Sequence, residues 1–172
     1  MLKHIILTIG GLFLALRLFS KKEAKDAAFK LITFFESSNK PSLKARYDQL
    51  GKRWEIGYGC TFYENGKKVQ PTDVITLERA KTLMYWHINQ AREKILLSVK
   101  VPINENQLQA LISFVYNVGI GAFRTSRMLT YINRKQFDLA ANEFDRWDNA
   151  GGVKNVAGLV KRRQTEKKLF QS

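Results

Sequence analysis

One stretch of this chain, residues 53–69, has the two-residue period of a β-strand, and it constrains the fold more than any other feature. Apolar or aromatic side chains recur there at every second position: Trp54, Ile56, Tyr58, Cys60 and Phe62. The dipeptide Asn65-Gly66 is typical of the two-residue turn that joins antiparallel strands, because that turn needs positive φ angles. The stretch therefore predicts a β-hairpin over residues 53–69.

Most of the sequence around this stretch has helical spacing. Apolar residues recur every three or four positions in five segments, at about residues 20–36, 76–98, 104–118, 123–147 and 159–170. Ser20 with Glu23, and Asn104 with Gln107, have the spacing of a capping box, in which the two residues satisfy open amides at a helix start. Gly119 is suited to close the third helix. A small sheet followed by a helical bulk predicts an α+β fold.

Composition excludes several classes of protein. With 45% hydrophobic and 26% charged residues in 172, the chain is neither disordered nor a polytopic membrane protein. One cysteine excludes an intramolecular disulfide and a cysteine-built zinc site, and two histidines argue against a histidine-rich metal centre. We therefore expect no metal and no cofactor. The net charge of +14 favours polyanionic partners, but the chain has no recognisable nucleic-acid motif, so no specific nucleic-acid partner is expected.

Residues 1–19 differ from the rest of the chain. An apolar run from Ile5 to Phe19, broken by Arg17, lies between basic residues. The run is shorter than the ~20 apolar residues of a membrane span, but it has the size of a secretory signal. Three interpretations stay open: an export signal or weak anchor that contacts the inner membrane, a cleaved signal, or a hydrophobic arm packed on the domain or a partner. Residues 20–172 then form one catalytic domain.

Three acids lie close together in the sequence: Glu36 at a helix end, Asp48 in a predicted loop, and Glu55 in the predicted hairpin. Each has an ordinary explanation, as a surface acid, a turn former or a solvated strand charge. However, a carboxylate at a helix C-terminus meets the unfavourable end of the helix dipole. Glu55 also shares its predicted strand face with Gly57 and Gly59, where another molecule can approach the backbone. Carboxylates facing each other across a cleft suit glycoside hydrolysis.

These residues resemble the active-site segment of phage-type lysozymes, glycoside hydrolase family 24. The resemblance rests on Glu36, residues 43–48, Gly51 and residues 56–61, which read Ile-Gly-Tyr-Gly-Cys-Thr. It continues through residues 106–123, which resemble the central helix of the family. Trp147, Gly151-Gly152 and residues 158–166 resemble its C-terminal signature. The matching segments occur in order and span about residues 28–170.

The resemblance implies a lysozyme-like fold, in which a small β-hairpin lobe joins a mostly helical lobe and the active-site cleft lies between them. It implies a muramidase that cuts the β-1,4 bond between N-acetylmuramic acid and N-acetylglucosamine in peptidoglycan. We expect a monomeric phage endolysin that reaches the host periplasm and cell wall after export or pore-mediated release, or in a membrane-tethered or virion-associated form. The alternative is a virion-associated or degenerate relative that binds cell wall with little activity.

The resemblance also assigns roles by position. It implies that Glu36 is the general acid and Asp48 the second carboxylate. The remaining implied roles are in binding the substrate and in supporting the catalytic glutamate. Gly57, Tyr58 and Gly59 line the cleft, Asn117 helps to hold the sugar chain, and Arg162 pairs with the catalytic glutamate. For Arg163, an inward position and a solvated one both stay open.

The sequence departs from the family pattern at two positions. Glu55 stands where the family has threonine, and Cys60 stands where it has histidine. A glutamate at position 55 can act as a base or as a nucleophile. A carboxyl separation of about 5 Å from Glu36 predicts retention of the anomeric configuration, whereas about 6.5–9.5 Å predicts inversion. We expect Cys60 to pack in the interior and His87, in the middle of a helix, to be structural.

Overall fold

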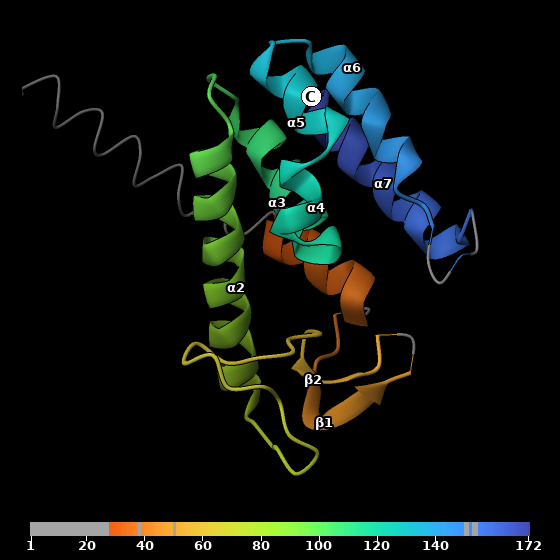
Figure 1. Ribbon diagram of the computed structural model, residues 1–172. Coiled ribbons are helices and arrows are strands. Elements are labelled where there is room, and N and C mark those ends of the chain that lie inside the picture. The colour runs from red at the N-terminus through yellow and green to blue at the C-terminus, as the bar shows by residue number, and fades with distance from the viewer. Residues whose placement is uncertain (1–27, 38, 50, 150–151, 153–154) are drawn as a thin grey trace, which may run out of the picture.

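The computed structural model describes residues 28–37, 39–49, 51–149, 152 and 155–172. Figure 1 shows a small β lobe at one end of the long helix α2 and a bundle of helices beside the rest of it. This is the expected α+β architecture. Residues 1–19 and the predicted capping box of Ser20 and Glu23 lie outside the described residues. The first described element is helical over residues 28–37, so it ends close to residue 36, where the sequence predicted the end of the first helix.

The β lobe contains two antiparallel strands, β1 (Ser42–Asp48) and β2 (Arg53–Gly57). The predicted hairpin over residues 53–69 is wrong in its pairing, because β2 pairs with the preceding strand. Residues 58–69 contribute only the bridges Ile56↔Cys60 and Phe62↔Lys68. The physical reason is that Gly57 and Gly59 have φ angles of 64° and 84°, which turn the chain directly after β2. The predicted Asn65-Gly66 turn does form, closed by the Tyr63 amide, which donates to the Lys67 carbonyl.

The chain between β2 and α2 is fastened to the start of α2. Arg79 donates a 2.7 Å hydrogen bond from Nη1 to Glu64 Oε1, and its guanidinium lies over the Tyr63 ring. The Tyr63 hydroxyl donates to Asp73 Oδ2 at 2.9 Å. Beneath this segment lies a small apolar cluster of Ile56, Cys60, Val69 and Leu83. The β lobe thus has its own core, held against α2 by polar contacts.

The helical lobe follows the predicted spacing in its two longest helices. The helix α2 (Leu77–Ser98) begins at the cap residue Thr76, and α3 (Glu105–Val118) begins with the predicted capping box of Asn104 and Gln107. Every side chain of α3 from Gln107 to Val115 is buried. Figure 1 shows α3 in the middle of the lobe, with α2 on one side and α7 (Ala157–Phe170) on the other. The main hydrophobic core surrounds α3.

The predicted helix over residues 123–147 is divided into shorter pieces. These are α4 (Ile120–Arg124), α5 (Arg127–Asn133), α6 (Phe137–Glu143) and the 3₁₀ turn η1 (Phe144–Arg146). Ser126 starts α5 as its cap, because its hydroxyl accepts a bond from the Leu129 amide. Lys135, with a φ of 58°, reverses the chain after α5. These turns are local events that an average apolar period does not reveal.

Among the described residues, no helix is both long enough and apolar enough to cross a membrane.

The contact of Glu64 with Arg79 predicts a specific dependence of stability on acid. The hydrogen bond from Arg79 lowers the pKa of the Glu64 carboxyl from 4.5 to about 2. Because the folded state holds this carboxylate ionised, its contribution is complete above the unfolded pKa and is lost as the pH falls toward 2. We expect the denaturant midpoint of Glu64→Gln to fall less than that of the parent between about pH 5 and about pH 2.

The matched control is Glu93→Gln, which removes an exposed carboxylate of α2. Its midpoint should follow the parent across the same pH range. Equal slopes for the parent and Glu64→Gln would show that the contact does not couple protonation to folding.

Candidate active site

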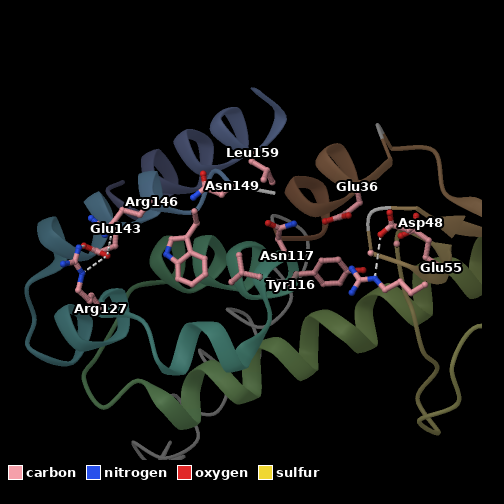
Figure 2. A pocket seen from close by; sticks show the side chains of 15 residues that line it. Glu36, Asp48, Glu55, Tyr116, Asn117, Arg127, Glu143, Arg146, Asn149 and Leu159 are labelled. Atoms are coloured by element: carbon pink, nitrogen blue, oxygen red, sulfur yellow. Dashed lines mark hydrogen bonds and ion pairs between the residues drawn. The ribbon is translucent and has the colours of Figure 1, made fainter. Parts of the chain in front are cut away.

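A cleft of about 890 Å³ runs between the β lobe and the helical lobe. It collects side chains from the helix over residues 28–37, from both strands, from the end of α3 and from the α5–α7 region (Figure 2). Its lining residues are Glu36, Asp48, Gly51, Arg53, Glu55, Gly59, Tyr116, Asn117, Val118, Arg127, Glu143, Arg146, Trp147, Asn149 and Leu159. The structure therefore brings the three predicted acids into one cavity.

Glu36 is positioned by an arginine of α7. Arg162 Nη1 lies 2.6 Å from Glu36 Oε1, and this bond joins residues 126 positions apart. The other oxygen, Oε2, lies beside Gly59, where an ideal Cβ atom would come within 3.3 Å of it. Gly59 also has a φ of 84°, which L side chains rarely adopt. The predicted pairing of Glu36 with Arg162 is present in the structure, and it leaves Glu36 Oε2 beside the cleft backbone.

Arg162 belongs to a network that is almost completely buried. Its Nε lies 3.1 Å from Glu166 Oε1, and its Nη2 donates to the Ser113 carbonyl at 3.1 Å. The Ser113 hydroxyl donates to the same Glu166 oxygen at 2.6 Å. Arg163 Nε lies 2.8 Å from Glu166 Oε2, and its guanidinium lies over the Phe114 ring. Arg163, whose orientation the sequence left open, therefore points inward.

Burial shifts the pKa values of both an acidic and a basic side chain in this network. It raises the pKa of the Glu166 carboxyl, while Arg163, Arg162 and the Ser113 hydroxyl act in the opposite direction. Burial lowers the pKa of the Arg163 guanidinium to about 10, so this side chain stays charged at neutral pH. Two buried cations thus surround Glu166, which has no exposed surface. A buried cluster of charged side chains is tolerated only when each charge is paired with an opposite one.

The two acids of the β lobe are held by cross-strand arginines. Arg46 lies opposite Glu55 in the strand register, and Arg46 Nη2 is 2.6 Å from Glu55 Oε1. Asp48, which was predicted in a loop, is the last residue of β1 and lies opposite Arg53, whose Nε is 3.9 Å from Asp48 Oδ2. Figure 2 shows Asp48 and Glu55 together at the Glu36 end of the cleft.

A glycine is required at position 51 because the side chains of Asp48 and Arg53 lie close to its backbone. An ideal Cβ atom at this position would lie 2.2 Å from Asp48 Oδ2 and 2.9 Å from Arg53 Nε. Any side chain would therefore displace the carboxylate. This explains why a glycine follows the acid in the turn between the strands.

Two predicted lining residues do not line the cleft. Tyr58 is buried, with its ring edge-on to Phe29, and its carbonyl accepts a 3.0 Å bond from the Tyr116 hydroxyl. Gly57 faces α2, where a Cβ atom would contact Ala80. Tyr58 is buried together with Ile56 and Cys60, as the alternation of the sequence predicts, and the positive φ of Gly57 turns this glycine toward α2. Of the predicted substrate-binding residues, Gly59 and Asn117 line the cleft.

Cys60 packs in the interior, as predicted. Burial raises the pKa of its thiol to about 11, so the sulfur is protonated and unreactive at neutral pH. His87 contacts the β lobe through Nε2, which lies 3.0 Å from the Phe62 carbonyl. Within the described part of the chain, no group of three or more His, Cys, Asp or Glu side chains is placed to hold a metal ion.

Sequence reasoning missed the charged group at the other end of the cleft. Glu143 accepts bonds from Arg127, with Nη2 to Oε1 at 2.8 Å, and lies 3.5 Å from Arg146 Nε. Trp147 lines the same cleft. Arg46 and Arg53 were missed as well. Of these pairs, only Glu143 with Arg146 has a local i,i+3 spacing. The other pairs join different elements, so no local pattern identifies them.

Comparison with known proteins agrees with this geometry. The family model of Phage lysozyme matches residues 37–166. The endolysin of Salmonella phage P22 is 34% identical over 82% of this chain and 94% of its own length. Among solved structures, the muramidase domain of SpmX from Asticaccaulis excentricus has a TM-score of 0.73 at 32% identity, covering 85% of this chain and 95% of that domain. Fold and cleft are those of a lysozyme-like protein.

The chain belongs to the phage lysozyme family. The endolysin of Bacillus phage PZA is 39% identical over 87% of this chain. The chain spans only 55% of the length of that relative.

The buried network predicts a large effect of a single amide substitution. Glu166→Gln leaves the guanidinium groups of Arg162 and Arg163 buried without their shared anion. We expect a loss of about 3–5 kcal/mol in the free energy of unfolding, measured by denaturant titration. Asp145→Asn breaks an exposed pair between η1 and Lys167 of α7, and it should cost less than about 1 kcal/mol. Equal losses in the two variants would contradict the role given to the network.

Proposed function

We propose that this chain is a muramidase that hydrolyses the β-1,4 bond between N-acetylmuramic acid and N-acetylglucosamine in peptidoglycan. The observation that carries the proposal is Glu36, held at Oε1 by Arg162 and facing a cleft that also contains Asp48 and Glu55. Membership of the phage lysozyme family supports the same substrate. Peptidoglycan is the polymer to which such a cleft and a chain of net charge +14 are suited.

Glu36 is proposed as the general acid. Its Oε1 is occupied by Arg162, so Oε2 is the oxygen that protonates the leaving sugar oxygen. Gly59 gives the substrate access to that oxygen, because it has no side chain between Glu36 and the cleft. Arg162 is a positioning residue that fixes the orientation of the carboxyl group. Asn117, which lines the cleft beside Glu36 in Figure 2, is proposed to bind the sugar chain.

Asp48 and Glu55 are proposed to complete the reaction from the β lobe. Asp48 supplies negative charge near the sugar cation that develops as the bond breaks. Glu55, anchored by Arg46 at one oxygen, is proposed to take a proton from the attacking water. This assignment predicts inversion, because water and not the enzyme attacks the sugar.

In the cell, the proposed role is that of a phage endolysin that opens the host wall. Residues 1–19 are proposed to carry the domain formed by residues 20–172 across the inner membrane, as an export signal or anchor. Deleting residues 1–19 should then abolish lysis of expressing cells that contain no helper pore. Unchanged lysis would show that the segment does not export the protein.

Clearing of purified Gram-negative peptidoglycan tests the reaction. We expect Glu36→Gln to lower the rate by roughly 100- to 10,000-fold, the usual contribution of a general acid. Glu93→Gln, which changes an exposed carboxylate outside the cleft, should keep the parent rate. Glu55→Thr, which restores the residue typical of the family, should keep measurable activity. An inert parent that gains activity with Glu55→Thr would indicate a binding protein instead of a lysozyme.

The configuration of the first product tests the role of Glu55. NMR of the newly formed reducing end should show the anomer of inverted configuration before mutarotation. A product of retained configuration would contradict the assignment of Glu55 as a base. It would indicate instead that a carboxylate attacks the sugar and forms a covalent intermediate.

A further inference from the structure

Tyr116 joins the two lobes beside the proposed acid. It stands near the end of α3, and it lines both the cleft and the adjoining cavity that leads toward Trp86 of α2 (Figure 2). Its hydroxyl donates a 3.0 Å hydrogen bond to the carbonyl of Tyr58, directly after β2 in the β lobe. A side chain of the helical lobe therefore holds the β-lobe backbone directly before Gly59, which lines the cleft.

The backbone held by this bond is easily rotated. Tyr58 lies between Gly57 and Gly59, whose φ angles are 64° and 84°. Glycine adopts positive and negative φ about equally well, so the peptide group between Tyr58 and Gly59 can turn over at little steric cost. The amides of Ile56 and Cys60 each donate a 2.9 Å bond to the carbonyl of the other, which closes the turn at its ends and leaves this peptide group free to rotate. The hydroxyl bond therefore selects its orientation.

This orientation matters because Gly59 lies against the proposed acid. An ideal Cβ atom on Gly59 would come within 3.3 Å of Glu36 Oε2. A peptide group is planar, so a rotation of the Tyr58 carbonyl turns the Gly59 amide with it and changes the backbone surface beside Oε2. Glu36 thus has two supports, which are Arg162 at Oε1 and the Gly59 backbone beside Oε2.

A thiol completes the contact. Cys60 Sγ lies 3.7 Å from Tyr116 Oη, and burial raises the pKa of the thiol to about 11, so it carries a proton at neutral pH. The single proton of the Tyr116 hydroxyl is directed to the Tyr58 carbonyl, so the thiol is the donor between Cys60 and Tyr116. Burial also raises the pKa of the Tyr116 hydroxyl well above its usual value, so this hydroxyl remains a donor. A row of hydrogen bonds therefore runs from Cys60 through Tyr116 to Tyr58.

We propose that Tyr116 is a positioning residue, whose hydroxyl, oriented by the Cys60 thiol, fixes the Tyr58–Gly59 peptide group against Glu36. The destination of the hydroxyl bond favours this role over simple packing, because the bond ends on the carbonyl directly before Gly59. Tyr116 acts through Glu36 and takes no proton itself. The inference rests on the proposed function, because it concerns the placement of the proposed acid. A misplaced acid slows proton transfer and leaves sugar binding unchanged, so the effect belongs in kcat.

Tyr116→Phe removes the hydroxyl and keeps the ring. The substrate is a soluble, peptide-free strand of alternating N-acetylglucosamine and N-acetylmuramic acid. We expect kcat to fall roughly tenfold, the equivalent of one lost hydrogen bond to a buried carbonyl, while KM stays near the parent value. A rise in KM at unchanged kcat would assign the hydroxyl to sugar binding and overturn the proposal. An unchanged kcat and KM would overturn it as well.

Tyr63→Phe is the matched control. It removes a comparable hydroxyl bond in the same lobe, to Asp73 Oδ2 at 2.9 Å, and Tyr63 does not line the cleft. The parent kcat should be kept even if the free energy of unfolding falls as much as in Tyr116→Phe. An equal loss of kcat in the two variants would show that activity follows the stability of the β lobe, which contradicts a positioning role.

Substitutions of Cys60 test the thiol. Cys60→Ala should lower kcat roughly two- to threefold, whereas Cys60→Ser, which keeps a donor, should stay near the parent value. If the thiol acts through Tyr116, adding Cys60→Ala to Tyr116→Phe should cause no further loss of kcat. A double variant that shows the product of the two single losses would overturn the role given to Cys60.

The amide resonance of Gly59 separates this inference from the proposed function, because NMR reads it without substrate. Tyr116→Phe should shift this resonance and broaden it through microsecond-to-millisecond exchange, measured by relaxation dispersion, whereas Tyr63→Phe should leave it unchanged. These changes support the inference even if the parent cleaves no glycan, in which case only the proposed function fails. An unchanged Gly59 resonance in Tyr116→Phe overturns the inference even if the parent is an active muramidase.

Discussion

The buried contact of Glu166 with Arg162 and Arg163 is the interaction on which the rest of the structure depends. Three charged side chains are removed from water at the centre of the helical lobe, where burying an unpaired charge would be strongly unfavourable. The charges are tolerated because Glu166 is paired with both arginines, Arg162 is also paired with Glu36, and the Ser113 hydroxyl donates a hydrogen bond to Glu166. The same arginine that neutralises Glu166 holds Glu36. The packing of α7 on α3 and the position of the proposed acid are therefore fixed together.

The β lobe is organised by a different kind of constraint. Its acids are held by arginines directly opposite in the strand register, and glycines occupy the points where a Cβ atom would collide with a carboxylate. A separate small core and the contact of Glu64 with Arg79 fix this lobe to α2. Each lobe contributes one side of the cleft. The acids meet across it because α2 holds the two lobes in one orientation.

Local signals in the sequence predicted the helices well. The capping box at Asn104 and the apolar period of α2 and α3 depend on residues three or four positions apart, and these were confirmed. The hairpin pairing was wrong, because alternation does not reveal which neighbour a strand will choose. The division of residues 123–147 was missed for a related reason. A cap such as Ser126 interrupts a helix at one residue, while the apolar period is averaged over many.

The sequence by itself determined the types of secondary structure, the trio of Glu36, Asp48 and Glu55, and the resemblance to phage lysozymes. These follow from residue types and short spacings, which the backbone geometry of helices and strands converts directly into local structure. Only the tertiary structure decided that Arg163 points inward onto the Phe114 ring, that Gly57 faces α2, and that the cleft continues toward Trp86. These arrangements depend on how the elements pack in three dimensions, where contacts join residues that have no fixed spacing in the chain.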